Sequence, residues 1–513
     1  MSFHWVVLAW MLAGVLVGLG IQFQTAGPAW AGATWAELDA GGVELVKGTG
    51  PASSAMERGL VRGVGVDAVV AHRGADEELR TALATPEDIQ GVIDAAEVGD
   101  VLWLEGPGID PISLNLKLDP SSMRAKILAP FSFAADIFLA LLKMLIVPLI
   151  LTSIVSGVAG VGAMKDLRRM GGKTFAYYVS TSLLAVLVGQ ILVTIMQPGT
   201  GAQLGLSPLK DGDAAPDASF IDVLKRMIPT NIFESMSANG EMLSVIFFAL
   251  LFGAFITRAK EPHKTRMSDF FESAYQVMIS MAEGILKLLP YGVFALLVGV
   301  VAGTGFGVFK PLLLYMATVL IALIIHACIT LPVILKVIGG VSPKRWFRAM
   351  SPAIMTAFST SSSSMTLPVT IDTVEKRGGV SNKVASFTLP LGATINMDGT
   401  ALYECIGVIF LAQYYQHTGQ FDLTLTTQAV VVVMALLASI GAAGIPSAGL
   451  VMMLTILTTL GLPVEGAALI LAVDRPLDML RTVVNVWSDS CGAAVIGASE
   501  GELAEDPLEA AAT

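Results

Sequence analysis

The chain has 513 residues, of which 54% are hydrophobic and 14% are charged, and its mean hydropathy is +0.71. This composition is typical of a polytopic membrane protein and excludes an ordinary water-soluble domain. The formal net charge is −11 and no basic patch with interleaved aromatic residues is present, so nucleic acid is not an expected partner. The cysteines Cys328, Cys405 and Cys491 lie in apolar segments without metal-ligand spacing.

The first apolar segment predicts a retained transmembrane helix over residues 1–23. A signal peptide is the alternative, because AWA at 29–31 resembles a cleavage site, but no Lys or Arg precedes the apolar run. Residues 24–122 then mix Asp, Glu, Arg and Gly around the strand-like runs DAVVAH and DVLWLEG and the helical run PEDIQGVIDAAE. This pattern predicts a small soluble α+β insert rather than a disordered segment.

Further apolar segments follow in quick succession, at about 131–163, 174–196, 242–256, 274–301 and 312–337. The short loops at 165–173, 257–266 and 342–348 are basic, whereas the loop around residues 211–217 is acidic. We expect the protein to lie in the inner (plasma) membrane of the cell. Because Lys and Arg concentrate in cytoplasmic loops, both termini are expected on the cytoplasmic side and the insert on the outer side. Residues 499–513 are expected to form an acidic cytoplasmic tail.

Two later segments, 357–370 and 438–453, are apolar overall but are broken midway by Ser, Gly and Pro. Such segments can enter the membrane and return on the same side where protein or a water-filled cavity covers them. Paired interrupted segments indicate the binding site of a transporter. An intramembrane serine hydrolase is disfavoured because only His326 of the five histidines lies in an apolar segment, so we expect no enzyme. A receptor whose insert senses a ligand is the remaining alternative.

The last apolar segment, residues 469–496, contains DRPLDMLRTVVNVWSD, in which polar residues recur at steps of three and four. On an α-helix these positions share one face. That face consists of Asp474, Asp478, Arg481, Thr482, Asn485 and Asp489. Charged side chains at membrane depth are costly and normally face a bundle interior or a cavity. Ion pairs that only join helices are one interpretation, but so much charge on one stripe favours a site for a charged ligand.

Two residues of this face suggest the chemistry of the ligand. The guanidinium of Arg481 matches a carboxylate in bidentate fashion. Asp478, three residues earlier, suits an ammonium group, although the two side chains could also simply pair. A ligand held by both carries an amino group and an extra carboxylate, which describes aspartate or glutamate.

The stretch GATINMDGTALYE, at 392–404, places the carboxylate of Asp398 in apolar sequence with no Lys or Arg nearby. A buried carboxylate needs a counter-charge, and carboxylate and amide oxygens suit hard cations. We therefore expect monovalent cation sites, with a divalent ion as the alternative, built from Asn396, Asp398, Asn485 and Asp489. The serine run at 359–364 offers hydroxyls and backbone N–H groups for a carboxylate, although a flexible turn would look the same.

At this point the motifs STSSSSMTLP, TINMDGTALYE, ASIGAAGIP and DMLRTVVNVWSD resemble those of the glutamate transporter family, the dicarboxylate/amino acid:cation symporters. The segments LKMLIVPLI and IPTNIFESM are similar to scaffold helices of that family. The resemblance covers about 128–498 and the first helix. It implies an all-α fold with about eight transmembrane helices and two re-entrant hairpins, assembled as a homotrimer that moves substrate by an elevator motion.

The resemblance also divides the transporter core, 123–498. The scaffold would span about 128–163, 219–260 and 269–303, and the transport domain about 170–197 and 308–498, with hairpins at about 349–378 and 424–460. The family's substrate contacts carry over to Ser363, Thr400, Ile445, Gly449, Asp478, Arg481, Thr482 and Asn485. Its three sodium positions carry over to Gly392, Asn396, Asn485 and Asp489; to Thr394, Ser439, Ile440 and Ala442; and to Tyr178, Thr181, Ser182, Asn396 and Asp398.

The resemblance implies uptake of L-aspartate or L-glutamate with sodium and without a further cofactor. Glu404 is similar to the animal transporters, where this residue is tied to proton cotransport and potassium countertransport, although a structural carboxyl is the alternative. A second arginine of the family is absent, because Ser361 and Met479 occupy its two usual positions. A C4-dicarboxylate or neutral amino acid symporter, proton-coupled or not, is the alternative function.

Overall fold

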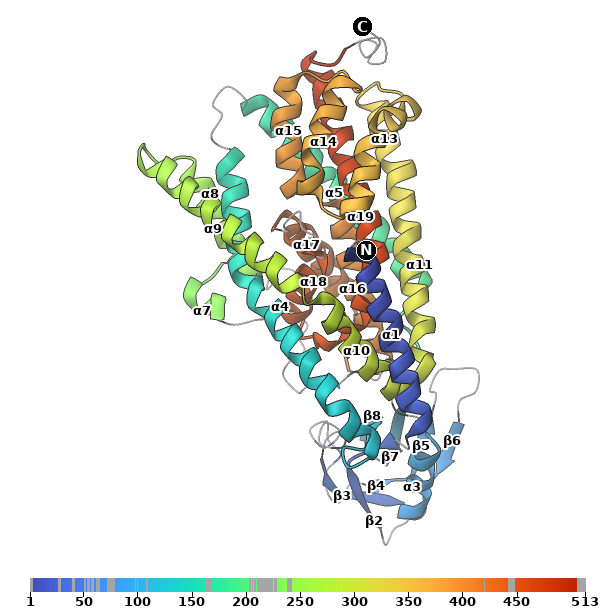
Figure 1. The fold of residues 1–513 in the computed structure, drawn as a ribbon. Helices are drawn as coiled ribbons and strands as arrows, with labels where there is room; N and C mark the ends of the chain where they lie inside the picture. The colour runs from blue at the N-terminus through green and yellow to red at the C-terminus, as the bar shows by residue number, and fades with distance from the viewer. Residues whose placement is uncertain are drawn as a thin grey trace.

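The computed structural model describes most of the chain. The described residues are 3–25, 29–38, 42–49, 65–71, 79–96, 98, 100–107, 109–161, 168–202, 228–237, 242–418, 420–441 and 448–504, with single positions at 52, 56, 60, 204, 206, 209 and 225. Figure 1 shows a long helical bundle with a small β-rich unit at one end and the C-terminus at the other.

The β-rich unit follows the first helix, α1 (Phe3–Gln24), and is built from three antiparallel sheets. Strand β1 (Ala29–Trp30) pairs with β9 (Lys117–Leu118). The second sheet has the order β2 (Ala33–Glu37), β3 (Val43–Gly48), β4 (Gly65–Val66), and the third has the order β6 (Leu79–Ala82), β5 (Ala68–Ala71), β7 (Val101–Gly106), β8 (Ile109–Asn115). The runs DAVVAH and DVLWLEG therefore contribute β5 and β7.

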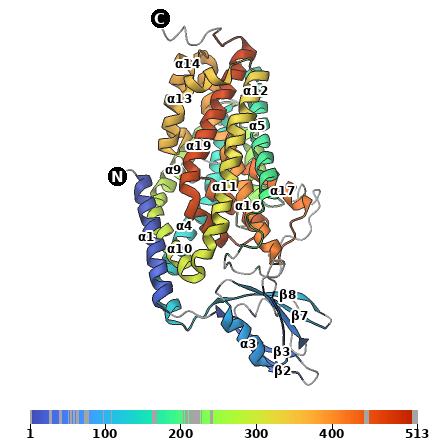
Figure 2. The same cartoon turned by 90° about the vertical axis from the view of Figure 1, so that its right-hand side faces the viewer.

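Helix α3 (Pro86–Ala95) lies beside the strands of this unit, as shown in Figure 2. It buries Ile89 and Ile93 in the apolar core of the unit. The helix begins where its sequence favours a start, since Pro86 occupies the first position and the carboxylate of Asp88 accepts from the backbone N–H of Thr85 at 2.8 Å. The unit thus has an apolar core of its own, separate from that of the bundle.

Peripheral helices form one side of the bundle. They are α1, α4 (Met123–Val161), α8 (Met242–Ile256), α9 (His263–Leu286) and α10 (Leu289–Thr304), and α7 (Ile232–Ser237) lies beside them in Figure 1. Helix α1 packs along α10, where a Cβ at Gly14 or Gly18 would meet the backbone of α10 at 3.0–3.1 Å. The first apolar segment is therefore a helix packed on the bundle.

The apolar segment at 274–301 does not form one straight helix. Helices α9 and α10 meet at a bend of 50° between residues 286 and 289. Pro290, the second residue of α10, has no N–H, and its ring would clash with the carbonyl four residues earlier in a continuous helix, which favours a bend at this point.

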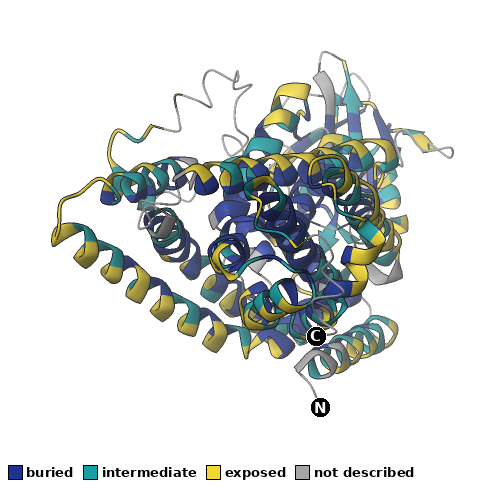
Figure 3. Cartoon of the chain, turned by 90° about the horizontal axis from the view of Figure 1, so that it is seen from above, coloured by how far each residue is buried: buried dark blue, intermediate teal, exposed yellow. Residues whose placement is uncertain are grey.

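The other half of the chain surrounds a nearly solvent-free centre, visible as the dark core of Figure 3. It contains α5 (Arg168–Met196), α11 (Phe309–Ile325), a π-helical turn (His326–Thr330), α12 (Leu331–Val337) and α16 (Asp398–His417). Residues 398–415 of α16 are all buried. This helix therefore carries Asp398 and Glu404 into the buried centre of the bundle.

Both interrupted segments form pairs of helices that pack on each other. Helix α13 (Pro343–Thr360) ends at Ser361, whose φ of 52° is left-handed, and α14 (Ser363–Lys376) returns alongside it. Helices α17 (Leu425–Gly441) and α18 (Ala448–Thr459) form the second pair, and residues 442–447 between them lie outside the described residues. Helix α15 (Asn382–Ile395) precedes α16, and the 36-residue α19 (Glu465–Glu500) packs against α13, α15 and α16.

Within the described residues, four helical segments are long and apolar enough to cross a membrane, and a fifth if the bent pair α9–α10 counts as one. The protein is thus a mainly helical, multi-pass membrane protein. The number of spans, the domain limits and the side on which each loop lies stay predictions.

Candidate functional site

The backbone between α15 and α16 is unwound at the centre of the bundle. Asn396 (φ −99°, ψ 82°) and Met397 (φ −113°, ψ 59°) both leave the helical region. Gly392 and Gly399 permit the close packing around this break. A Cβ on Gly392 would overlap the carboxylate of Asp489, and one on Gly399 would lie 2.6 Å from the carbonyl oxygen of Arg481. The break therefore brings α15 and α16 directly against α19.

A cluster of oxygen-bearing side chains surrounds this break, and we call it the ion cluster: Tyr178, Thr181, Ser182, Asn396, Asp398, Ser488 and Asp489. Asn396 is its hub, because its Nδ2 donates to Asp489 Oδ1 at 2.9 Å and to Ser488 Oγ at 3.0 Å. Its Oδ1 accepts from Thr181 Oγ1 at 3.2 Å. All the members are buried. The structure thus brings together most residues predicted for two cation positions.

Three groups donate to or face the carboxylate of Asp398. Ser182 Oγ lies 2.6 Å from Oδ1, and Ser488 Oγ lies 2.7 Å from Oδ2. The third is His326 Nε2, 3.0 Å from Oδ2, with both side chains fully buried. His326 begins the π-helical turn, a form often found at functional sites. The sequence analysis did not assign His326 to this cluster, although it is the histidine that falls within an apolar segment.

The structure supports the other predicted ion ligands less directly. Tyr178 lies at the cluster but donates its hydroxyl to the carbonyl of Thr388 at 2.8 Å. Thr394, Ser439 and Ile440 lie on α15 and α17, which pack on each other, while Ala442 lies outside the described residues. That second predicted position therefore stays a prediction.

The predicted ligand residues of α19 lie beside the ion cluster. Arg481 is 1% exposed, its Nη2 contacts Asp478 Oδ1 at 2.7 Å and Asp474 Oδ1 at 3.1 Å, and its guanidinium lies 3.7 Å from the centre of the Tyr403 ring. Its Nε and Nη1 atoms are buried without a hydrogen-bond partner among the described residues. Buried unsatisfied donors are uncommon and need an explanation, such as a ligand that the structure does not contain.

Some of the other residues predicted to contact substrate lie close to Arg481, whereas the structure does not place the rest there. Asn485 joins the two helices, because its Oδ1 accepts from the backbone N–H of Gly399 at 2.8 Å and its Nδ2 donates to Thr400 Oγ1 at 3.2 Å. A Cβ on Gly449 would lie 2.7 Å from Arg481 Nη1, so α18 also reaches this point. Thr482 donates to the carbonyl of Asp478 at 2.9 Å. Ser363 is buried on α14, which packs on α19, and Ile445 lies outside the described residues.

Glu404 lies one turn beyond Thr400 on α16 and is fully buried. Neither carboxyl oxygen has a hydrogen-bond partner among the described residues. An ionised carboxylate would be costly in such surroundings.

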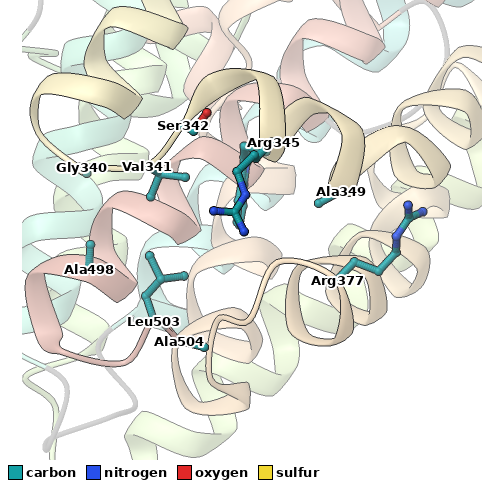
Figure 4. Close-up of a pocket in the computed structure, with 11 residues that line it drawn as sticks. Gly340, Val341, Ser342, Arg345, Ala349, Arg377, Ala498, Leu503 and Ala504 are labelled. Atoms are coloured by element: carbon teal, nitrogen blue, oxygen red, sulfur yellow. The ribbon is translucent and has the colours of Figure 1, made fainter. Parts of the chain in front are cut away.

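A separate pocket opens near the C-terminal end of the bundle. It has a volume of about 270 Å³ and is lined by the start of α13, Arg377, Ala498 and residues 503–504 (Figure 4). None of the predicted substrate or ion residues lines it.

An enclosed, charged site formed by interrupted helices within a multi-pass membrane bundle defines a secondary transporter. The family described as the sodium:dicarboxylate symporter family matches residues 112–499. The chain belongs to this family, whose members are transporters.

Named relatives agree with this assignment. Excitatory amino acid transporter 1 of Ambystoma tigrinum is 34% identical over 469 residues, covering 80% of this chain and 84% of that protein. The proton/sodium-glutamate symport protein of Bacillus caldotenax is 33% identical, with 74% and 90% covered. The proton/glutamate-aspartate symporter of Escherichia coli (strain K12) is 34% identical, with 71% and 84% covered.

Proposed function

We propose that the protein is a secondary active symporter that takes up L-aspartate or L-glutamate together with sodium. The observation that carries the proposal is Arg481, whose buried Nε and Nη1 atoms have no partner among the described residues and lie beside Asp478. An anionic ligand would supply the acceptor that these buried donors lack. The printed names of three relatives, which refer to excitatory amino acids, glutamate and aspartate, support the same substrate class.

In the proposed complex, the side-chain carboxylate of the ligand binds Arg481 and its ammonium group binds Asp478. Thr482 and Asn485 complete the α19 side of the site. The remaining contacts come from α16 and the two hairpins: Ser363, Thr400, Ile445 and Gly449. A ligand without the second carboxylate would leave the guanidinium donors unsatisfied, and buried unpaired groups of this kind give strong selectivity.

Sodium is proposed to bind at the ion cluster as a transported ion. Asn396, Asp398 and Asp489 offer amide and carboxylate oxygens, which suit a hard cation. A few carboxylates among neutral amide and hydroxyl oxygens favour a monovalent cation over a divalent one. The group formed by Thr394, Ser439, Ile440 and Ala442 is proposed as a further position.

Glu404 is proposed to couple transport to a proton or to potassium. Its unpartnered, fully buried carboxyl group supports the proposal, because a proton or a cation would remove the cost of the buried charge. A structural carboxyl group would instead be expected to have hydrogen-bond partners.

The proposed transport cycle places α1, α4 and α7–α10 in a fixed scaffold and α5 and α11–α19 in a mobile domain. The α13–α14 and α17–α18 hairpins would act as re-entrant gates, and the protein would form a homotrimer. We also propose that the insert faces the outside of the cell membrane and that both termini face the cytoplasm, because the loops at 257–266 and 342–348 are basic.

The test is radiolabelled L-aspartate and L-glutamate uptake into proteoliposomes with an inward sodium gradient, with and without internal potassium. We expect sodium-dependent uptake that Arg481→Cys abolishes, because the anionic ligand loses its partner. Unchanged L-aspartate uptake by R481C would contradict the assigned role. If no sodium gradient drives uptake, neutral amino acids and C4-dicarboxylates should be compared under sodium and proton gradients.

A further inference from the structure

Arg475 is a second buried arginine next to the proposed ligand site. It lies on α19, three residues before Asp478, and its Nη1 is 3.0 Å from Asp478 Oδ2. Its side chain is 3% exposed. Because Arg481 contacts the other oxygen, Oδ1, at 2.7 Å, each carboxylate oxygen of Asp478 has a guanidinium of its own.

The second guanidinium changes the charge of the site. Asp474 and Asp478 carry two negative charges, and Arg475 and Arg481 carry two positive charges, so the four side chains sum to zero. Without Arg475 the sum would be −1 at a point where an anionic ligand must bind. In a buried region of low dielectric, one charge a few ångströms away has a large effect on ligand affinity.

The arrangement has a specific consequence when a ligand binds Arg481. The guanidinium must then share its donors between Asp478 and the carboxylate of the ligand. Asp478 retains Arg475 on Oδ2, so it is not left as an uncompensated buried charge. A ligand amino group is therefore not required to neutralise this aspartate.

We infer that Arg475 determines specificity by supplying a permanent cation at Asp478, which lowers the site's preference for ligands that carry an amino group. The inference rests on the proposed function, since it takes Asp478 as the partner of the ligand's ammonium group. Succinate, which has the two carboxylates of aspartate but no amino group, is the probe that measures this preference.

The experiment measures sodium-driven L-aspartate uptake in proteoliposomes and its competitive inhibition by succinate. The quantity of interest is the succinate inhibition constant divided by the KM for L-aspartate. For the wild-type protein we expect a ratio within about tenfold of unity, because Arg475 already neutralises Asp478. In Arg475→Met the ratio should rise about tenfold or more, since Asp478 then repels the amine-free dianion and attracts the ammonium group.

Arg475→Lys keeps the positive charge and should restore most of the wild-type ratio. Arg258→Met is the matched control, because Arg258 is an exposed arginine in the α8–α9 turn and its loss should leave the ratio unchanged. A merely structural role for Arg475 would change both ligands equally, and an unchanged ratio in R475M would overturn the inference.

If R475M does not insert in the membrane, the ratio of the succinate inhibition constant to the L-aspartate KM in the wild-type protein tests the inference instead. A ratio above about one hundred, with normal L-aspartate uptake, overturns the inference and leaves the proposed function intact. Absence of L-aspartate uptake under a sodium gradient refutes the proposed function, and the inference falls with it.

Discussion

Asn396 provides a direct test of the ion cluster, because Asn396→Asp preserves its shape and changes only its chemistry. The amide Nδ2 now donates to Asp489 Oδ1 at 2.9 Å and to Ser488 Oγ at 3.0 Å. A carboxylate at this position cannot donate unless it is protonated, and it faces the existing carboxylate of Asp489. The substitution therefore replaces two hydrogen bonds with a like-charge contact in a fully buried place.

Two energies decide the size of the effect. Two unit negative charges 2.9 Å apart repel by about 6 kcal/mol at an effective dielectric constant of about 20. Protonating one ordinary aspartate at pH 7 costs about 4 kcal/mol, because its usual pKa is about 3.9. The smaller cost sets the outcome, so we expect Asn396→Asp to lower the free energy of unfolding by about 4 kcal/mol when no cation is bound.

Thermal unfolding of the detergent-purified protein measures this effect in choline chloride and in sodium chloride at equal ionic strength. We expect N396D to melt well below the wild type in choline and to gain more stability from sodium, since a cation between two carboxylates replaces the proton. Asn382→Asp is the control, because the exposed Asn382 donates to Glu375 at 2.7 Å and a surface charge contact is worth about 1 kcal/mol or less. If N396D matches the wild type in choline, or gains no more from sodium, the ion cluster is wrongly assigned.

Two further predictions concern the ligand site and the insert. Gly449→Ala would place a Cβ 2.7 Å from Arg481 Nη1, so the KM for L-aspartate should rise about tenfold in the uptake assay, and an unchanged KM would contradict the placement of α18. The backbone N–H of Thr85 holds the pKa of the Asp88 carboxyl below its usual range. A depressed pKa stabilises the folded insert at neutral pH, and this contribution is lost as the pH falls from the ordinary aspartate pKa through the folded-state pKa. When the insert's resistance to proteolysis is measured against pH, it should therefore fall less on acidification in Asp88→Asn than in the wild type.

The spacing of the polar residues and their chemical type were sufficient to predict the polar face of α19. The steps of three and four between Asp478, Arg481 and Asn485 place these side chains on one side of a helix, and the structure buries them together. The break at Asn396 was not predicted, although Gly392 and Gly399 flank it in the sequence. Family motifs supplied Thr181 and Ser182, which lie about 215 residues before their partners in the chain. Spacing along the chain carries no information about such a contact.

Features that depend on packing were not predictable in this way. His326 begins a π-helical turn and lies 3.0 Å from Asp398, and no residue pattern marks that turn. The position of the Tyr403 ring under Arg481 depends on how α16 and α19 cross. Likewise, the pairing of Arg475 with Asp478 follows from the rotamers of two neighbours on one helix, which the sequence leaves open.

The charge distribution of the two adjoining sites gives a physical reason for coupling ligand to cations. The four charged side chains of the ligand site balance each other. The ion cluster contains Asp398, which His326 contacts at 3.0 Å, and Asp489, which accepts from Asn396. In the proposed function, an acidic amino acid adds a net negative charge beside two carboxylates for which the described residues show no lysine or arginine partner. Cations proposed to bind in the cluster would remove that repulsion, and each species would then raise the affinity for the other by the same factor.

Asn485 provides the structural connection between these sites. Its Oδ1 accepts from the backbone N–H of Gly399, next to Asp398, and its Nδ2 donates to Thr400 at the ligand site. A cation that pulls the unwound backbone at Asn396 toward Asp489 would also shift Gly399, and through Asn485 would reposition Thr400. The proposed coupling thus needs no long pathway, because the proposed ligand and cation positions share one short stretch of unwound chain between α15 and α16.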